Sequence, residues 1–185
     1  MWRWLVGTLV VLLLIVGWLA GLYNGLVGKD QLVKTNWAQI DSQLQRRYDL
    51  IPNLVETVKG YATHEKELFE NVAAARSAWA GAKSQGEKVA AANQAEGFLG
   101  RLIAVAENYP QLQASANFRA LQDELAGTEN RIAVARMRYN EAVQSYNVSA
   151  KSVPTVIFVG LFGFDREKMF FAAPKEAQAA PKVKF

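Results

Sequence analysis

The chain has 185 residues, of which 21% are charged, and its formal net charge is +4 at neutral pH. This length suits one modest domain with one anchor. The basic excess is small and dispersed, and no cluster of Lys and Arg interleaves with aromatic residues, which argues against nucleic acid as a partner. The excess fits a mild affinity for an anionic membrane surface instead. The sequence has no cysteine, which excludes disulfide bonds and a lipoprotein anchor.

The first element is a strongly apolar run, because no charged residue occurs between Arg3 and Lys29. A helix of about 20 apolar residues crosses a hydrocarbon core about 30 Å thick, and the stretch from Trp4 to Tyr23 has that length. We therefore expect residues 1–28 to form an N-terminal transmembrane anchor, with the lipid bilayer as the first partner of the chain.

Aromatic residues lie towards both ends of this run, as they do at membrane interfaces: Trp2 and Trp4 at one end, Trp18 and Tyr23 at the other. The alternative interpretation is a cleaved secretory signal, whose small-residue site the stretch ending at Ala20 would imitate. A retained anchor is favoured because the apolar run exceeds the roughly 7–15 residues usual in signals and Trp18 occupies a position that needs a small residue.

The anchor also carries three glycines at intervals of four residues, Gly17, Gly21 and Gly25. Residues at this spacing form one stripe on a helix, and such a stripe lets two membrane helices approach closely. We interpret these glycines as candidates for self-association, although glycine is also simply common in membrane helices.

Beyond the anchor, apolar residues recur every 3.5 residues, the period of helices that pack side by side in coiled coils. No useful stretch alternates with the period of two that a strand requires. The pattern occupies three segments: Val33, Trp37, Ile40, Leu44, Arg47, Ile51, Leu54, Val58, Tyr61, Glu65, Leu68, Val72, Ala75 and Trp79; Ala92, Ala95, Leu99, Leu102, Ala106 and Tyr109; Phe118, Leu121, Leu125, Thr128, Ile132, Ala135, Tyr139, Ala142 and Tyr146.

Three breaks separate these segments. Residues 81–86 (GAKSQG) read as a polar turn bounded by glycine, Pro110 suits the first turn of a new helix, and residues 152–154 (SVP) end the last long helix. Short connections between amphipathic helices imply antiparallel neighbours. The predicted fold is therefore all-α, an elongated up-and-down antiparallel bundle of three to four long helices over residues 29–152.

Pro52 lies inside the longest segment, where it removes a hydrogen bond to the Tyr48 carbonyl and should kink a helix. Because the apolar period passes through Pro52 without a phase shift, we predict one continuous, kinked helix from about Lys29 to Ala80. The alternative is a tight turn at Asp49 that reverses the chain.

The C-terminal part divides into two pieces. Residues 153–171 are apolar but too short to span a bilayer as a helix, so they either pack on the bundle, which is favoured, or lie on the membrane surface. Residues 172–185 are rich in Ala, Pro and Lys, and we expect them to be a disordered tail.

The residue inventory argues against catalysis. His64 is the only histidine, and with Glu67 it forms a pair that could hold a metal ion only weakly. A solvated histidine is favoured, so the sequence predicts no metal, no cofactor and no catalytic residue.

Two charged residues, Arg47 and Glu65, occupy positions where the apolar period calls for a hydrophobe. Buried charges need partners, and we expect Glu124 or Glu129 to pair with Arg47. For Glu65 the expected partners are Arg131 or Arg136. Such pairs often fix helix register and oligomeric state, but both side chains could instead extend out to water.

Residues 46–65 (RRYDLIPNLVETVKGYATHE) resemble the LemA family of bacterial membrane proteins. The likeness extends from Tyr23 to Phe171 and includes residues 107–112 (ENYPQL), 128–132 (TENRI) and 135–143 (ARMRYNEAV). It implies a helical bundle on one N-terminal membrane helix, with a small N-terminus outside the cell. The family has no established enzymatic activity, so no catalytic residue can be transferred.

The leading hypothesis is a membrane-anchored, self-associating scaffold without catalytic activity. It would form homo-oligomers and bind other membrane proteins at the bacterial inner membrane. A slight excess of basic residues after the anchor favours a cytoplasmic bundle. The alternative is a membrane-remodelling or lipid-sensing protein that uses residues 153–171 as a second membrane contact.

Overall fold

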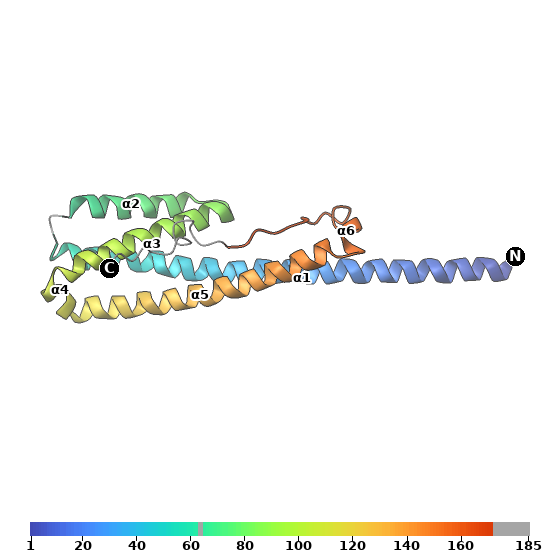
Figure 1. Ribbon diagram of the computed structural model, residues 1–185, viewed down its shortest axis with the longest axis horizontal. Helices are drawn as coiled ribbons and strands as arrows, with labels where there is room; N and C mark the ends of the chain where they lie inside the picture. Colours follow the sequence, from blue (N-terminus) through green and yellow to red (C-terminus); the bar gives the residue numbers. More distant parts are fainter. Residues whose placement is uncertain (63–64, 172–185) are drawn as a thin grey trace, which may run out of the picture. The chain divides into compact units, whose positions relative to one another are not determined.

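The computed structural model describes residues 1–62 and 65–171. Within these residues there are six helices and no strand, so the all-α prediction is confirmed. The helices are α1 (Trp2–Lys59), α2 (Lys66–Gly81), α3 (Gln85–Glu107), α4 (Pro110–Ala114), α5 (Ala116–Lys151) and α6 (Thr155–Phe158) (Figure 1).

Helix α1 continues through Pro52 to Lys59. The prediction of a continuous helix at this proline is confirmed, and the reversal at Asp49 is wrong. However, the predicted extension of this helix to Ala80 is also wrong. The chain leaves α1 at Gly60, a poor helix former, and the amides of Tyr61 and Ala62 both hydrogen-bond to the Val58 carbonyl.

The described residues divide into two compact units, each with its own buried side chains. One unit contains residues 1–39 and 135–170. The other contains residues 40–134 and Phe171. Helices α1 and α5 contribute residues to both.

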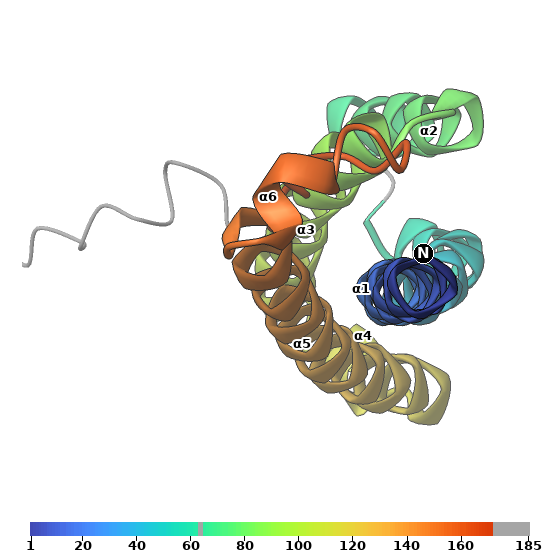
Figure 2. The same cartoon turned by 90° about the vertical axis from the view of Figure 1, so that its right-hand side faces the viewer.

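In the second unit, residues 40–59 of α1 form a bundle with α2, α3 and residues 116–134 of α5. Successive long helices alternate in direction (Figure 1), and α2 and α3 lie side by side in both views (Figure 2). The predicted apolar positions form the core. Buried members include Ile40, Leu44, Ile51, Leu54, Val58, Leu68, Val72, Trp79, Ala92, Ala95, Leu99, Leu102, Phe118, Leu125 and Ile132.

The return of α2 along α1 is fixed by aromatic contacts. The ring of Tyr48 stacks on Trp79 at 4.4 Å, and the Trp79 indole donates a hydrogen bond to Gln45 at 3.2 Å. The Tyr48 hydroxyl donates to the Ala91 carbonyl on α3 at 2.8 Å. Burial raises the pKa of Tyr48 to about 12, with nearby Arg47 opposing that rise.

The predicted breaks lie near helix ends, although α3 begins at Gln85, inside the stretch 81–86 predicted as a turn. Ser84 caps α3, since its hydroxyl accepts from the Glu87 amide at 3.2 Å while the Glu87 carboxylate accepts from the Ser84 amide at 3.0 Å. This reciprocal arrangement is the capping box. Pro110 opens α4, and α5 ends at Lys151, directly before the predicted break.

In the first unit, residues 135–151 of α5 pack along the part of α1 that follows the apolar run. Trp37 and Tyr139 form an edge contact at 5.6 Å. Leu26, Val33 and Tyr146 are buried, whereas residues 1–18 of α1 are all exposed. Helix α1 thus contains one segment long and apolar enough to cross a membrane, and no residue of that segment is buried.

Candidate functional site

The largest fully buried side chain among the described residues is that of Arg47, at 0% exposure in the C-terminal part of α1. Its guanidinium pairs with the carboxylate of Glu129 on α5, which is one of the two partners that the sequence pattern suggested. Glu129 itself is 44% exposed, so the pair connects the core to the bundle surface. A buried charge held in this way constrains which helix faces meet.

A polar network surrounds this pair and joins α1 to α5. Arg46 contacts Glu124 at 2.8 Å, and Glu124 also accepts from Arg131 at 3.0 Å. The Arg131 guanidinium donates in addition to the hydroxyl of buried Thr128 at 3.1 Å. Two adjacent arginines of α1 therefore meet two glutamates of α5, which fixes the register of these helices within the bundle.

The Arg47–Glu129 pair also borders a groove of about 480 Å³ between α3 and α5. Apolar side chains from both helices, including Leu99, Ile103 and Leu125, form most of its lining. Polar and charged residues, namely Glu96, Gln122 and Asp123, line the groove as well. A surface of this kind suits an apolar side chain or helix of a partner with a polar rim.

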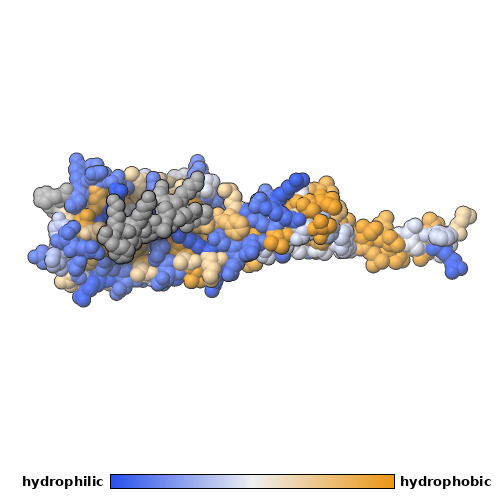
Figure 3. Space-filling model, viewed as in Figure 1, coloured by the Kyte–Doolittle hydropathy of each residue, from blue (hydrophilic) through white to orange (hydrophobic). Residues whose placement is uncertain are grey.

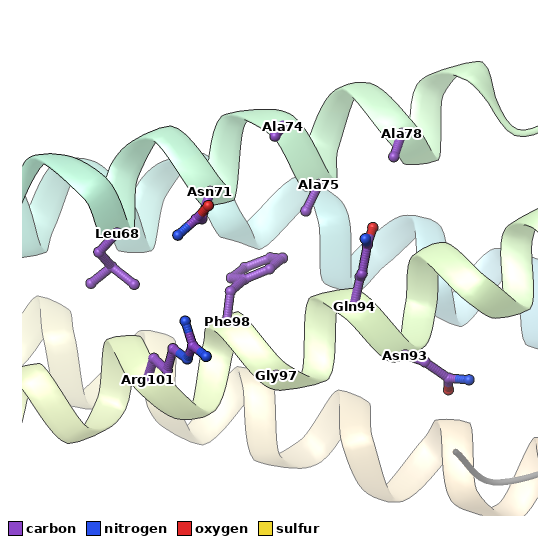
Figure 4. Close-up of a pocket in the computed structure, with 10 residues that line it drawn as sticks. All are labelled: Leu68, Asn71, Ala74, Ala75, Ala78, Asn93, Gln94, Gly97, Phe98 and Arg101. Atoms are coloured by element: carbon purple, nitrogen blue, oxygen red, sulfur yellow. The ribbon is translucent and has the colours of Figure 1, made fainter. Parts of the chain in front are cut away.

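A second groove, of about 500 Å³, lies between α2 and α3. Figure 4 shows Phe98 between the two helices, with Asn71 and Arg101 reaching from facing helices towards the same opening. Small residues such as Ala74 and Gly97 form much of the remaining lining.

The most elaborate polar arrangement lies where residues 165–169 return along α1 and α5, and we call these residues the strap. Asn147 of α5 hydrogen-bonds to both the amide and the carbonyl of Lys168, at 2.7 and 2.9 Å. The hydroxyls of Tyr146 and Tyr139 donate to the carbonyls of Asp165 and Met169, at 2.6 and 2.9 Å. The extended strap is thereby held at several successive backbone groups.

An ion cluster completes the strap. The Lys168 ammonium lies 3.0 Å from Asp30 of α1 and 2.7 Å from Asp165. Asp30 is only 6% exposed, and it also pairs with Lys34 at 2.8 Å. It lies just beyond the apolar run of α1.

The cluster shifts the pKa of both central groups in the direction that favours charge. Burial by itself would raise the pKa of Asp30, but hydrogen bonds from Lys34 and Lys168 outweigh it and bring the pKa below 3.8. Burial would lower the pKa of Lys168, but Asp165 and Asp30 outweigh it and bring the pKa above 10.5. The pair is therefore ionised throughout the physiological pH range.

Preceding the strap, aromatic side chains of residues 158–164 pack against the end of the apolar run. Phe158 meets Trp18 edge-on at 6.4 Å, and Tyr23 contacts both Phe162 and Phe164, at 5.4 and 5.6 Å. The segment predicted to pack on the bundle or on the membrane surface thus contacts the anchor helix itself.

The other predicted positions lie apart from this cluster. Gly17, Gly21 and Gly25 share one face of α1, and a side chain built at any of them would meet nothing within 4 Å. Glu65 is half-exposed, in the turn before α2 and not inside a long helix as predicted, because the break at Gly60 precedes it. Of its expected partners, Arg131 pairs with Glu124 instead.

No cluster of three or more potential metal ligands occurs in the described part of the chain. His64 and residues 172–185 lie outside it. Tyr139 and Tyr146, which hold the strap, were predicted only as members of the apolar period, and their hydrogen bonds to the strap were not foreseen. Asn147 and Lys168 were not singled out from the sequence.

A chain of this kind is a helical bundle continuous with an apolar N-terminal helix. This chain belongs to the LemA family, which matches residues 36–185. Similar proteins are the magnetosome proteins MamQ 1 and MamQ 2 of Paramagnetospirillum magneticum, each 26% identical, and MamQ of Magnetospirillum gryphiswaldense, 25% identical. Each similarity covers 82% of this chain, and the chain spans 65% of the length of these relatives.

Proposed function

We propose that this chain is a membrane-anchored, self-associating helical scaffold that acts by binding and not by catalysis. Its partners would be further copies of itself and other membrane proteins, at the inner membrane of a bacterium. The bundle would face the cytoplasm. The proposal rests on membership of the LemA family and on the geometry of α1.

The observation that carries the proposal is the continuity of α1. The same helix supplies the exposed apolar segment and, further along, the buried residues Ile40, Leu44 and Ile51 of the bundle. A 58-residue helix of this composition is suited to hold a bundle close to a bilayer. The MamQ relatives support a role at a membrane compartment, since their names place them with magnetosomes.

Support for self-association comes from the glycine stripe. The chain leaves open space at Gly17, Gly21 and Gly25, so this face of α1 is available to a second helix. Close approach of two helix backbones at small residues is a usual mode of association in lipid.

The stripe can be tested with two variants that introduce the same residue. Gly21→Leu should weaken association, because a bulky side chain holds the two backbones apart. Val16→Leu is the matched control, since at 3.6 residues per turn it lies about 140° around the helix from Gly21. Association is measured with a reporter fused to residues 1–35, so that the bundle cannot hold the oligomer together by itself.

A parallel measurement of particle size should be made on the full-length chain in detergent. Equal association of the two variants in the reporter would remove the stripe from the proposal. A strictly monomeric full-length particle would contradict self-association altogether.

A further inference from the structure

The segment between α5 and the strap exposes an unusually apolar face. Val153 is 82% exposed, Ile157 69% and Leu161 82%. Ile157 lies in α6, whereas Val153 and Leu161 lie in the turns directly before and after this short helix. Figure 3 shows hydrophobic surface gathered over α6 and along the N-terminal part of α1. In water, exposed apolar side chains of this kind would favour aggregation.

Aromatic side chains of the same segment determine its position along α1. Phe158 contacts Trp18, and Phe162 contacts Tyr23. Both α1 residues belong to the apolar run that ends before Lys29. If the roughly 20 residues from Trp4 to Tyr23 cross the hydrocarbon core, a side chain touching Trp18 lies at the depth of the bilayer boundary.

The backbone of this segment is suited to an environment poor in water, where unsatisfied amides are costly. The amides of Val156, Ile157, Val159, Phe162, Gly163 and Phe164 all hydrogen-bond to carbonyls of residues 152–160, at 2.9–3.1 Å. Gly163 adopts a left-handed conformation, with φ of 77°, which turns the chain back towards the strap.

The distribution of charged residues also fits an environment poor in water. Residues 152–164 contain no charged side chain, whereas Lys151 precedes them and Asp165 follows. The chain thus leaves the apolar region at Asp165, and the strap brings Lys168 to Asp30, just past the apolar run of α1. Along α1 and along the C-terminal segment, charged residues therefore resume at the same distance from the apolar run.

We propose that residues 153–164 insert into the headgroup and acyl-chain boundary of the bilayer that α1 crosses, with Val153, Ile157 and Leu161 facing lipid. The inference deepens the proposed function and depends on it, because it requires α1 to span the membrane. Lipid is favoured over a second copy of the chain because the exposed face adjoins the apolar run that lipid itself would surround. Insertion should depend little on anionic lipid, since the segment lacks basic residues.

The chain lacks cysteine, so single-cysteine variants of the full-length protein can carry an environment-sensitive fluorophore without further changes. The test position is Leu161→Cys. The control is Met137→Cys, also an exposed apolar residue of the same unit, at 54% exposure. It neighbours Tyr139, which packs on Trp37, about 20 Å beyond Tyr23 at 1.5 Å per residue. Val11→Cys marks the middle of the span.

Each variant is reconstituted in vesicles of phosphatidylcholine, with and without phosphatidylglycerol, and with quenchers placed at known depths on the acyl chains. We expect the fluorophore at Leu161 to shift to shorter wavelength and to be quenched by the shallow quencher in both lipid mixtures. The fluorophore at Val11 should be quenched by the deep quencher, and that at Met137 by neither.

Quenching at Val11 with none at Leu161 would overturn the inference and leave the anchor intact. Absence of quenching at Val11 would overturn the proposed function together with the inference. Quenching at Leu161 only with phosphatidylglycerol would contradict an apolar insertion. Cross-linking of Leu161→Cys between copies without quenching would assign the face to a second chain.

Discussion

Arg47 illustrates how one residue departs from a hydrophobic pattern without disrupting it. Its position inside the 3.5-residue period indicated burial, and its charge required an acidic partner on another helix. Glu129 supplies that partner. The structure adds the location of the pair on the edge of an open groove, which the sequence could not indicate because it depends on the distance between α3 and α5.

We expect Glu129→Gln to lower the free energy of unfolding by about 3 kcal/mol, because it leaves a buried guanidinium without its carboxylate. Arg47→Met should be nearly neutral or stabilising, since it replaces a buried charge by an apolar side chain of similar length. The measurement is denaturant unfolding of the detergent-solubilised chain.

Glu124→Gln serves as the control for this prediction. Glu124 is 36% exposed and pairs with arginines that are about half-exposed, so its loss should cost about 1 kcal/mol or less. If Glu129→Gln and Glu124→Gln destabilise the chain equally, the buried pair does not have the role assigned to it.

At the scale of elements, periodicity predicted the helices well and their boundaries unevenly. Pro110 indicated a helix start correctly through its local chemistry, whereas the cap at Ser84 was not predicted. The end of α1 at Lys59 was missed, because Leu68, Val72 and Trp79 of α2 continue the apolar phase of α1 across the turn. A repeat of 3.5 residues indicates which helix face is buried. It does not indicate a reversal of the chain when the apolar positions keep the same phase on both sides of the turn.

The apolar period could not predict the position of the strap, because the hydrogen bonds that hold it use the backbone of residues 165–169 and join distant parts of the sequence. Asn147 and Tyr146 recognise carbonyl and amide groups that every residue carries. Only the folded arrangement of α5 against the strap identifies those side chains as ligands for it.

The ion cluster should stabilise the strap less at very low and at very high pH. Because the pKa of Asp30 is lowered below 3.8, its stabilising effect is present above that value and is lost as the pH falls through the folded-state pKa. Because the pKa of Lys168 is raised above 10.5, its effect is present below that value and is lost as the pH rises through the folded-state pKa.

We therefore expect amide protection of residues 165–170, corrected for intrinsic exchange rates, to be highest between these limits. Asp30→Asn should lower that protection at neutral pH and abolish its loss in acid. Glu167→Gln is the control, since its pair with Lys151 is more than half-exposed on both sides. Protection that is unchanged in Asp30→Asn would show that the cluster does not hold the strap.

At the scale of the whole molecule, the proposed span of α1 would assign the two ends of this helix to opposite sides of the membrane. We expect the bundle to face the cytoplasm, in line with the basic residues Lys29, Lys34, Arg46 and Arg47 that follow the span. A cysteine at Gln85, an exposed residue at the start of α3, reports the location of the bundle.

An impermeant thiol reagent should label Gln85→Cys only after the inner membrane is permeabilised. It should label Trp2→Cys, at the other end of the span, in intact cells. The reverse pattern would place the bundle outside the cytoplasm. Labelling of both positions in intact cells would contradict a single retained span.

The unit that carries the apolar run is built from two distant parts of the described chain, since residues 40–134 lie between them in the sequence. During synthesis, Leu26 and Val33 therefore leave the ribosome long before Tyr139, Tyr146 and the strap exist to cover them. Any product that stops before residue 135 therefore leaves those apolar side chains without the residues that cover them. Completion of this unit thus distinguishes a finished chain from a truncated one.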